Sequence, residues 1–147
     1  MPFVCGGEWG GVILPKNYLA IDYGERRTGI AYASGSVGIA FPRETIDLGK
    51  TDLWAELERL VNENKITDFV LGIPIHPNNH PDSKQKIVEK FATELRLKFP
   101  QITLHLQDES YSTQEAISTV PSMKKNKERI DKAAAAIILQ RFLEGGY

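Results

Sequence analysis

Three acidic residues lie where predicted elements of the chain begin or end. Asp22 ends an apolar run, and Glu109 follows a run in which apolar and polar residues alternate. Asp131 lies in the opening turns of the last predicted helix. If the three carboxylates meet, they repel one another unless divalent cations lie between them. Oxygen ligands favour Mg²⁺ or Mn²⁺, and two such ions can stabilise both oxygens of an in-line phosphodiester displacement.

Basic residues flank two of these acids. Arg26 and Arg27 follow Asp22, and the densest group of cations surrounds Asp131, at Lys124, Lys125, Lys127, Arg129 and Lys132. Such residues could hold a polyanionic backbone. Taken singly, each feature has a plainer explanation: a charged hairpin turn, a solvated Asp-Glu turn, or a lysine-rich surface. The prediction of phosphodiester chemistry therefore depends on the acids and cations meeting in one place.

The predicted elements give the acids a common location. Strands are expected at 18–22, 28–33, 37–46, 69–73 and from 102 toward 108, with helices after the third, fourth and fifth strands and a final helix up to Gly145. A strand meander followed by helix–strand alternation predicts an α/β fold, with a mixed five-stranded sheet (βββαβαβαα) and helices on both faces. Pro42 places the third strand at an edge. Ligands of such sheets collect at the carboxyl ends of parallel strands, where Asp22 and Glu109 would lie.

Length and composition favour a single globular domain of ordinary size. The chain has 147 residues, of which 41% are hydrophobic and 25% charged, and its net charge of −1 gives no overall basic field. The single Cys5 excludes an internal disulfide, and no apolar run is long enough to span a membrane. A cytoplasmic protein is expected. Residues 1–17, rich in glycine, are predicted to form an irregular arm before a domain at 18–147.

Four motifs in this order resemble a bacterial family. They are Asp22-x-Gly24-x-x-Arg27-x-Gly29, Gly72-Ile-Pro74, Asp108–Thr113, and the stretch from Ile130 to Gln140. They resemble the pre-16S rRNA nuclease family, also called Holliday-junction-resolvase-like, of the ribonuclease H superfamily. The resemblance runs from about residue 19 to the C-terminus. It implies a ribonuclease-H-like fold and a cytoplasmic hydrolase that trims the 5′ end of precursor 16S rRNA, an rRNA-processing step of ribosome biogenesis.

The resemblance also implies roles for single residues. The catalytic acids, which would hold Mg²⁺ or Mn²⁺ in a two-metal site, fall on Asp22, Glu109 and Asp131. Residues expected to bind the substrate are Arg26, Arg27, Ser112, Thr113, Lys124, Lys125 and Lys127. Ser110 departs from the family, which has an arginine there, so a phosphate contact is missing or comes from Arg26 or Lys125. The loop at 75–82 lacks the usual glycine, which leaves its substrate contacts open.

Three other functions remain open on the sequence. A non-catalytic RNA-binding ribosome-assembly factor could keep the fold without the chemistry, and Ser110 makes this worth testing. A DNA-junction resolvase would need two active sites and hence a dimer, for which the sequence offers no evident face. A nucleotide-binding protein related to actin-like kinases needs two lobes, and the chain is long enough for one. The expected partners are therefore precursor rRNA or a ribosomal particle, with a DNA junction as the alternative, and the chain is expected to be a monomer or weak dimer.

Overall fold

The computed structural model describes residues 8–9, 12–13, 15–74, 83–109 and 127–145. Its centre is a five-stranded sheet in the order β5-β4-β3-β6-β7. The strands are β3 (Asn17–Asp22), β4 (Arg27–Ser34), β5 (Phe41–Asp47), β6 (Asp68–Ile73) and β7 (Thr103–Asp108). β3 runs antiparallel to β4 and parallel to β6, and β6 runs parallel to β7. The predicted mixed sheet is confirmed, and β5 with Pro42 lies at its edge.

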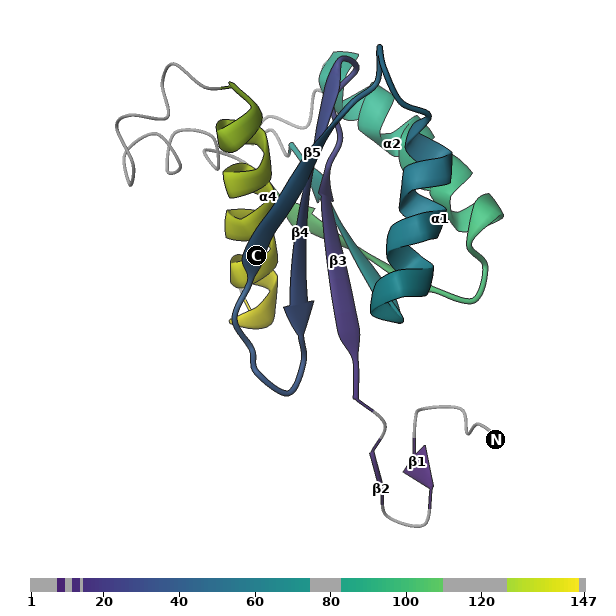
Figure 1. Ribbon diagram of the computed structural model, residues 1–147, viewed down its shortest axis with the longest axis vertical. Coiled ribbons are helices and arrows are strands. Elements are labelled where there is room, and N and C mark those ends of the chain that lie inside the picture. Colours follow the sequence, from purple (N-terminus) through teal and green to yellow (C-terminus); the bar gives the residue numbers. More distant parts are fainter. Residues whose placement is uncertain (1–7, 10–11, 14, 75–82, 110–126, 146–147) are drawn as a thin grey trace.

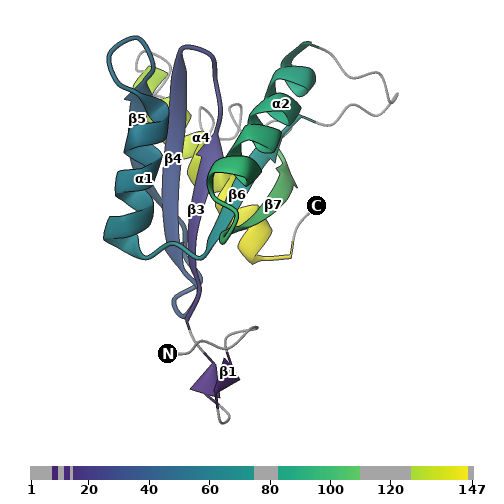
Figure 2. The ribbon, with the colours of Figure 1, turned by 90° about the vertical axis from the view of Figure 1, so that its right-hand side faces the viewer.

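Helices cover both faces of this sheet, as predicted (Figures 1 and 2). Helices α1 (Leu53–Asn64) and α2 (Ser83–Lys98) lie on one face, and α4 (Lys127–Leu143) lies on the other. The N-cap of α1 is Asp52, whose Oδ1 accepts a hydrogen bond from the Trp54 main-chain N–H at 3.1 Å. The short helix predicted to open at Ser112 lies outside the described residues. No helix in the described part of the chain is long and apolar enough to cross a membrane.

The third strand begins later than predicted, at Phe41 instead of Val37. The main-chain N–H groups of Val37 and Gly38 both donate to the carbonyl of Ser34, which makes a turn of this stretch. Gly38 has a φ of 74°, a left-handed conformation that ends extended structure and that glycine tolerates. Apolar residues in the stretch suggested a strand, but Val37 and Ile39 are exposed.

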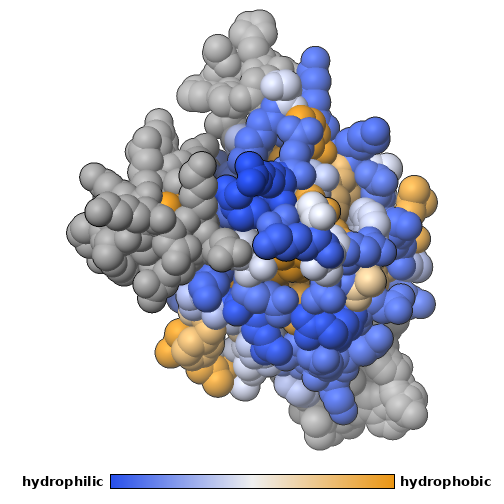
Figure 3. All heavy atoms as spheres, turned by 45° about the horizontal axis from the view of Figure 1, so that its top comes forward, coloured by the Kyte–Doolittle hydropathy of each residue, from blue (hydrophilic) through white to orange (hydrophobic). Residues whose placement is uncertain are grey.

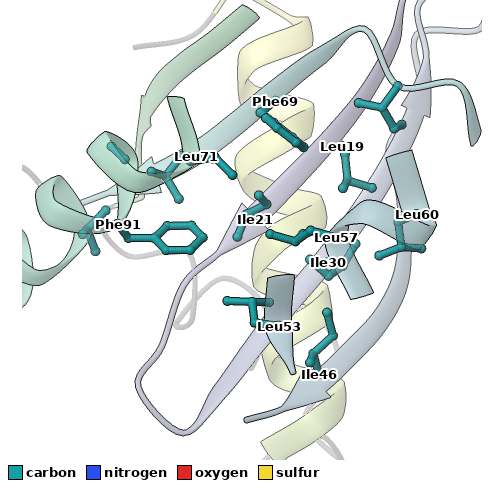
Figure 4. Close-up of a cluster of buried hydrophobic side chains, with 14 of the residues drawn as sticks. Leu19, Ile21, Ile30, Ile46, Leu53, Leu57, Leu60, Phe69, Leu71 and Phe91 are labelled. Atoms are coloured by element: carbon teal, nitrogen blue, oxygen red, sulfur yellow. The ribbon is translucent and has the colours of Figure 1, made fainter. Parts of the chain in front are cut away.

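Two apolar layers of different character hold the helices. Alternate residues of β3 point to opposite faces, so Leu19 and Ile21 pack toward α1 and α2, whereas Ala20 packs toward α4. Figure 4 shows the layer under α1 and α2, which is built from large side chains including Leu57, Phe69 and Leu71. The layer under α4 contains small residues of the sheet, which let this helix approach closely: Ala20, Ala31, Ala33 and Val70.

The N-terminal segment contributes a separate pair of strands. β1 (Glu8–Trp9) and β2 (Val12–Ile13) pair antiparallel with each other as a two-stranded sheet. Asn17, which was placed in the arm, is the first residue of β3. The division into an arm at 1–17 and a domain at 18–147 otherwise stays a prediction.

Candidate active site

Asp22 and Glu109 lie together at the carboxyl edge of the sheet, the end at which β3, β6 and β7 finish. Asp22 is the last residue of β3, and Glu109 follows the last residue of β7. The strand between them, β6, is parallel to both, so the three ends align. The Glu109 main-chain N–H donates to the carbonyl of Ile73 at 3.1 Å, which extends the ladder to the acid itself. Two strand ends therefore place two carboxyl groups side by side.

The two carboxyl groups interact strongly. Burial raises the pKa of Asp22 well above its ordinary value of 3.8, and the negative charge of Glu109 raises it further. A hydrogen bond between the two side chains and the charge of Asp131 act in the same direction, whereas Lys84 lowers this pKa. Like charges that share a partly desolvated site favour the protonated form of one member. In the absence of a cation, the pair therefore resists carrying two negative charges.

Asp131 reaches the same edge through a close contact between main chains. It is the fifth residue of α4, and that helix packs on β4. Gly29 is the cross-strand partner of Asp22, and a Cβ at Gly29 would overlap the main-chain carbonyl of Asp131. Glycine at this position thus lets the first turns of α4 lie directly over the strand next to Asp22.

The carboxylate of Asp131 is held by an arginine. Arg27 Nε donates to Asp131 Oδ2 at 3.0 Å, and both side chains are mostly buried, with exposed fractions of 21% and 26%. Arg27 is the first residue of β4, after the turn that follows Asp22. Thr28, the next residue of β4, is fully buried, and its hydroxyl donates to the carbonyl of Gly24 in that turn at 3.4 Å. The turn therefore positions the Arg27 guanidinium at the acid on α4.

The three acids do not form a ready-made set of metal ligands in the described part of the chain. No group of three His, Cys, Asp or Glu residues described there is arranged to hold a metal ion. Asp22 and Glu109 interact with each other, and the charge of Asp131 raises the pKa of Asp22. Asp131 Oδ2, however, accepts a hydrogen bond from Arg27. The shared catalytic and metal-binding role of Asp22, Glu109 and Asp131 stays a prediction.

The pair at the ends of β3 and β7 nevertheless fits a cation. Glu109 is 8% exposed, and its buried Oε1 has no hydrogen-bond partner among the described residues. A buried carboxylate oxygen without a partner is costly, and an oxygen-seeking divalent cation is a partner that would remove this cost.

Lys84 is a basic residue of the site that the sequence motifs did not indicate. It lies in the first turn of α2, and its Nζ is 3.8 Å from Glu109 Oε2. One signal was available in the sequence. Lys84 lies in the first turn of the helix that follows β6, and a helix after a parallel strand starts at the same edge as the strand end.

The remaining predicted substrate-binding residues are only partly placed. Arg26 is exposed, and its carbonyl accepts a hydrogen bond from Leu48 at 2.9 Å. Lys127 begins α4, but its side chain is not among the described parts. The structure does not describe Ser110 or the loop at 75–82, nor Ser112, Thr113, Lys124 and Lys125. Where described, the carboxyl edge has a mostly hydrophilic surface (Figure 3).

Known proteins resemble this chain over nearly all of its length. The sequence model of a family described as "RuvX: Holliday junction resolvase" matches residues 16–145. A protein of Opitutus terrae named "Putative pre-16S rRNA nuclease" is 33% identical over 131 residues, covering 86% of this chain and 90% of its own. Proteins of the same name from Aster yellows witches'-broom phytoplasma and Neisseria gonorrhoeae are 38% and 33% identical, covering 86% and 90% of this chain and 87% and 91% of their own.

A solved structure shares the fold. It is that of Thermus thermophilus RuvC in complex with a Holliday junction substrate, with a TM-score of 0.53 and 13% sequence identity over 88% of this chain and 94% of that one. The likeness confirms the predicted ribonuclease-H-like fold.

Proposed function

Because the chain belongs to the RuvX family of Holliday junction resolvases, we propose that it is a metal-dependent nuclease that hydrolyses phosphodiester bonds. We further propose that it acts in the cytoplasm on precursor 16S rRNA and trims its 5′ end during ribosome biogenesis. Relatives with 33% and 38% identity carry the name of a pre-16S rRNA nuclease and align over most of both chains, which supports this choice of substrate. The nucleic acid is bound at the carboxyl edge of the sheet.

The observation that carries the proposal is the interacting pair of the half-buried Asp22 and the buried Glu109. Two interacting carboxyl groups, one with an unpartnered buried oxygen among the described residues, are poorly stabilised without a cation. The pair would hold Mg²⁺ or Mn²⁺, and Asp131, which is near enough to affect Asp22, would complete the ligand set in a two-metal arrangement. A bound divalent cation supplies positive charge that stabilises the oxygens of a phosphodiester displacement.

The protein's own side chains position the substrate and the acids. Arg27 orients Asp131 through Nε, and a guanidinium carries further N–H donors whose planar geometry suits a phosphate. We assign the binding of the nucleic-acid strand to residues that lie near the acids in the sequence. They are Arg26, which follows Asp22, Ser112 and Thr113, which follow Glu109, and Lys124, Lys125 and Lys127, which precede Asp131. Burial of Glu109 excludes water from its carboxylate and strengthens its interaction with a cation.

Cleavage of defined substrates tests the proposal. A precursor 16S rRNA segment, a single-stranded DNA of the same sequence and a four-way DNA junction are incubated with the wild type and with Glu109→Gln, each with Mg²⁺, with Mn²⁺ and without metal. The expected result is metal-dependent cleavage of the RNA by the wild type and none by Glu109→Gln. RNA binding with no cleavage of any of the three substrates in any metal would refute the nuclease and favour an assembly factor.

Junction resolution is the second candidate, because the matching family is described as a Holliday junction resolvase. Symmetric cleavage of the four-way junction, with the RNA left intact, would establish it in place of rRNA processing. Resolution requires two active sites, so the protein would also have to form a dimer, which the sedimentation velocity of the protein–junction complex would reveal.

A further inference from the structure

Lys84 is an exposed lysine whose ammonium group lies close to the acid pair. Its Nζ lies 3.8 Å from Glu109 Oε2, and the exposed fractions are 53% for the lysine side chain and 8% for that of Glu109. Helix α2, which carries Lys84, begins at the end of the sheet where β6 and β7 finish (Figure 2). The ammonium group is therefore near the buried Glu109 and within reach of a ligand that arrives from solution.

This placement is favourable only while the acid pair is negative. The charge of Lys84 lowers the pKa of Asp22, so the lysine partly balances the pair in the metal-free protein. A divalent cation bound by the same carboxylates would supply more positive charge at the same place and would repel the ammonium group. The lysine stem is flexible and half exposed, so the ammonium group can move away without disturbing the core.

After its displacement by a cation, the ammonium group would be stabilised by contact with another anion. The phosphates of a strand bound at the carboxyl edge are the anions expected there, and lysine is a common point-charge ligand for phosphate. Arg27 is less suited to such a movement, because it is 21% exposed and bound to Asp131 at 3.0 Å. Of the two cations seen at the acids in the described part of the chain, Lys84 is the more exposed.

We propose that Lys84 is an exchangeable counter-cation of the active site. Its ammonium group balances Asp22 and Glu109 in the metal-free protein, and it binds a phosphate of the nucleic-acid strand once a divalent cation occupies the pair. The proposal rests on the nuclease function proposed above and adds a substrate-binding residue to it. It also makes a claim about metal binding that is measured without any substrate.

The first experiment measures Mn²⁺ binding in the absence of nucleic acid, by the electron paramagnetic resonance of free Mn²⁺. Lys84→Gln removes the competing charge, and we expect it to bind Mn²⁺ up to about fivefold more tightly than the wild type. Lys86→Gln is the matched control, because Lys86 is exposed on the same helix but two residues away, on a different face. Equal affinities of Lys84→Gln and the wild type, or no Mn²⁺ binding by either protein, would overturn the proposal.

The second experiment measures the phosphate contact through its salt dependence. With Mn²⁺ present, Lys84→Gln should raise KM for a single-stranded RNA and reduce the slope of log KM against log salt by about 0.7, the share of one phosphate contact. Lys84→Arg keeps the charge and should restore the wild-type slope, and Lys86→Gln should leave it unchanged. An unchanged slope in Lys84→Gln would overturn the phosphate contact.

The two proposals can fail separately. If the wild type cleaves none of the substrates, the nuclease function is refuted. The salt slope is then taken from filter binding of the same RNA with Mn²⁺, and this slope and the Mn²⁺ affinities still decide the role of Lys84. If the wild type cleaves RNA and Lys84→Gln matches it in both measurements, only the role of Lys84 is refuted.

Discussion

Gly72 lies between the helix that carries Asp131 and the acid that follows β7, and substituting it should separate stability from catalysis. A Cβ at Gly72 would lie 2.6 Å from Cδ1 of Ile138 and 3.1 Å from Cβ of Glu109. Ile138 is fully buried on α4, so its side chain has little room to move. Overpacking of a tight core costs about 1–3 kcal/mol, and we expect Gly72→Ala to lower the free energy of unfolding by about 2 kcal/mol.

The atom at 2.6 Å can be removed on its own. Ile138→Val deletes Cδ1 and should cost about 1 kcal/mol by itself, as such truncations typically do. In the double variant the shortest contact with residue 138 becomes the one at 3.4 Å to Cγ1, which is an ordinary distance. The double variant should therefore lose about 1 kcal/mol instead of the sum of about 3, a coupling well above the error of a double-mutant cycle.

Urea unfolding and cleavage assays on the four proteins test this reasoning. The contact at 3.1 Å between the new methyl group and Cβ of Glu109 should shift that acid and lower the cleavage rate of Gly72→Ala. This contact remains in the double variant, so its cleavage rate should also be low even though part of the stability is recovered. Additive losses in the free energy of unfolding would show that the Ile138 contact does not exist. Wild-type cleavage by the double variant would show that the position of Glu109 does not depend on Gly72.

Three further predictions concern single side chains. Asp22→Asn should abolish cleavage and stabilise the metal-free protein at neutral pH. Because the folded-state pKa of Asp22 is raised, the stability that this group contributes is fully present below its ordinary pKa of 3.8 and is lost as pH rises through the raised pKa. This loss should be absent from melting curves of Asp22→Asn measured against pH. Arg27→Gln should lower stability by about 1 kcal/mol and also lower kcat, because it removes the hydrogen bond from Arg27 Nε to Asp131 Oδ2, and cleavage at the wild-type rate would contradict this. Asp68→Ala should lower the free energy of unfolding in urea by about 2 kcal/mol, since Asp68 is 2% exposed and accepts hydrogen bonds from Thr67 at 2.6 Å and His105 at 2.8 Å. It should leave kcat unchanged, because Asp68 lies at the end of β6 opposite to the acid pair.

Much of the fold could be predicted because local patterns and tertiary packing agree. The continuous apolar run before Pro74 is a buried interior strand, β6, and the spacing of Leu53, Leu57 and Leu60 gives the buried face of α1. The prediction failed at Val37, where the apolar residues are exposed and a turn at Ser34 decides the conformation. Turn geometry of this kind depends on main-chain hydrogen bonds that residue patterns indicate poorly.

The positions of Asp22 and Glu109 could be predicted from the sequence, but the side-chain contacts of Arg27 and Lys84 could not. Strand ends fix where Asp22 and Glu109 lie, because consecutive parallel strands must finish at one edge. The partner of Asp131 is separated from it by 104 residues, and the contact of Lys84 with Glu109 depends on the conformation of a long side chain. No local pattern in the sequence encodes such pairings.

The spacing of the first motif has a physical explanation in the hairpin. Asp22 and Gly29 are directly opposite each other on β3 and β4, so the glycine marks the strand position next to the acid. Because a Cβ there would overlap the carbonyl of Asp131, the main chain of α4 is seated beside Asp22 by contact with main chain, whatever side chain residue 131 carries. The far end of α4 is fixed independently, since Gln140 Oε1 accepts a hydrogen bond from the Ala40 N–H at 2.9 Å. Gly29 and Gln140 thus act together with the apolar layer beneath α4 to set the helix position, and none of these contacts uses the Asp131 side chain.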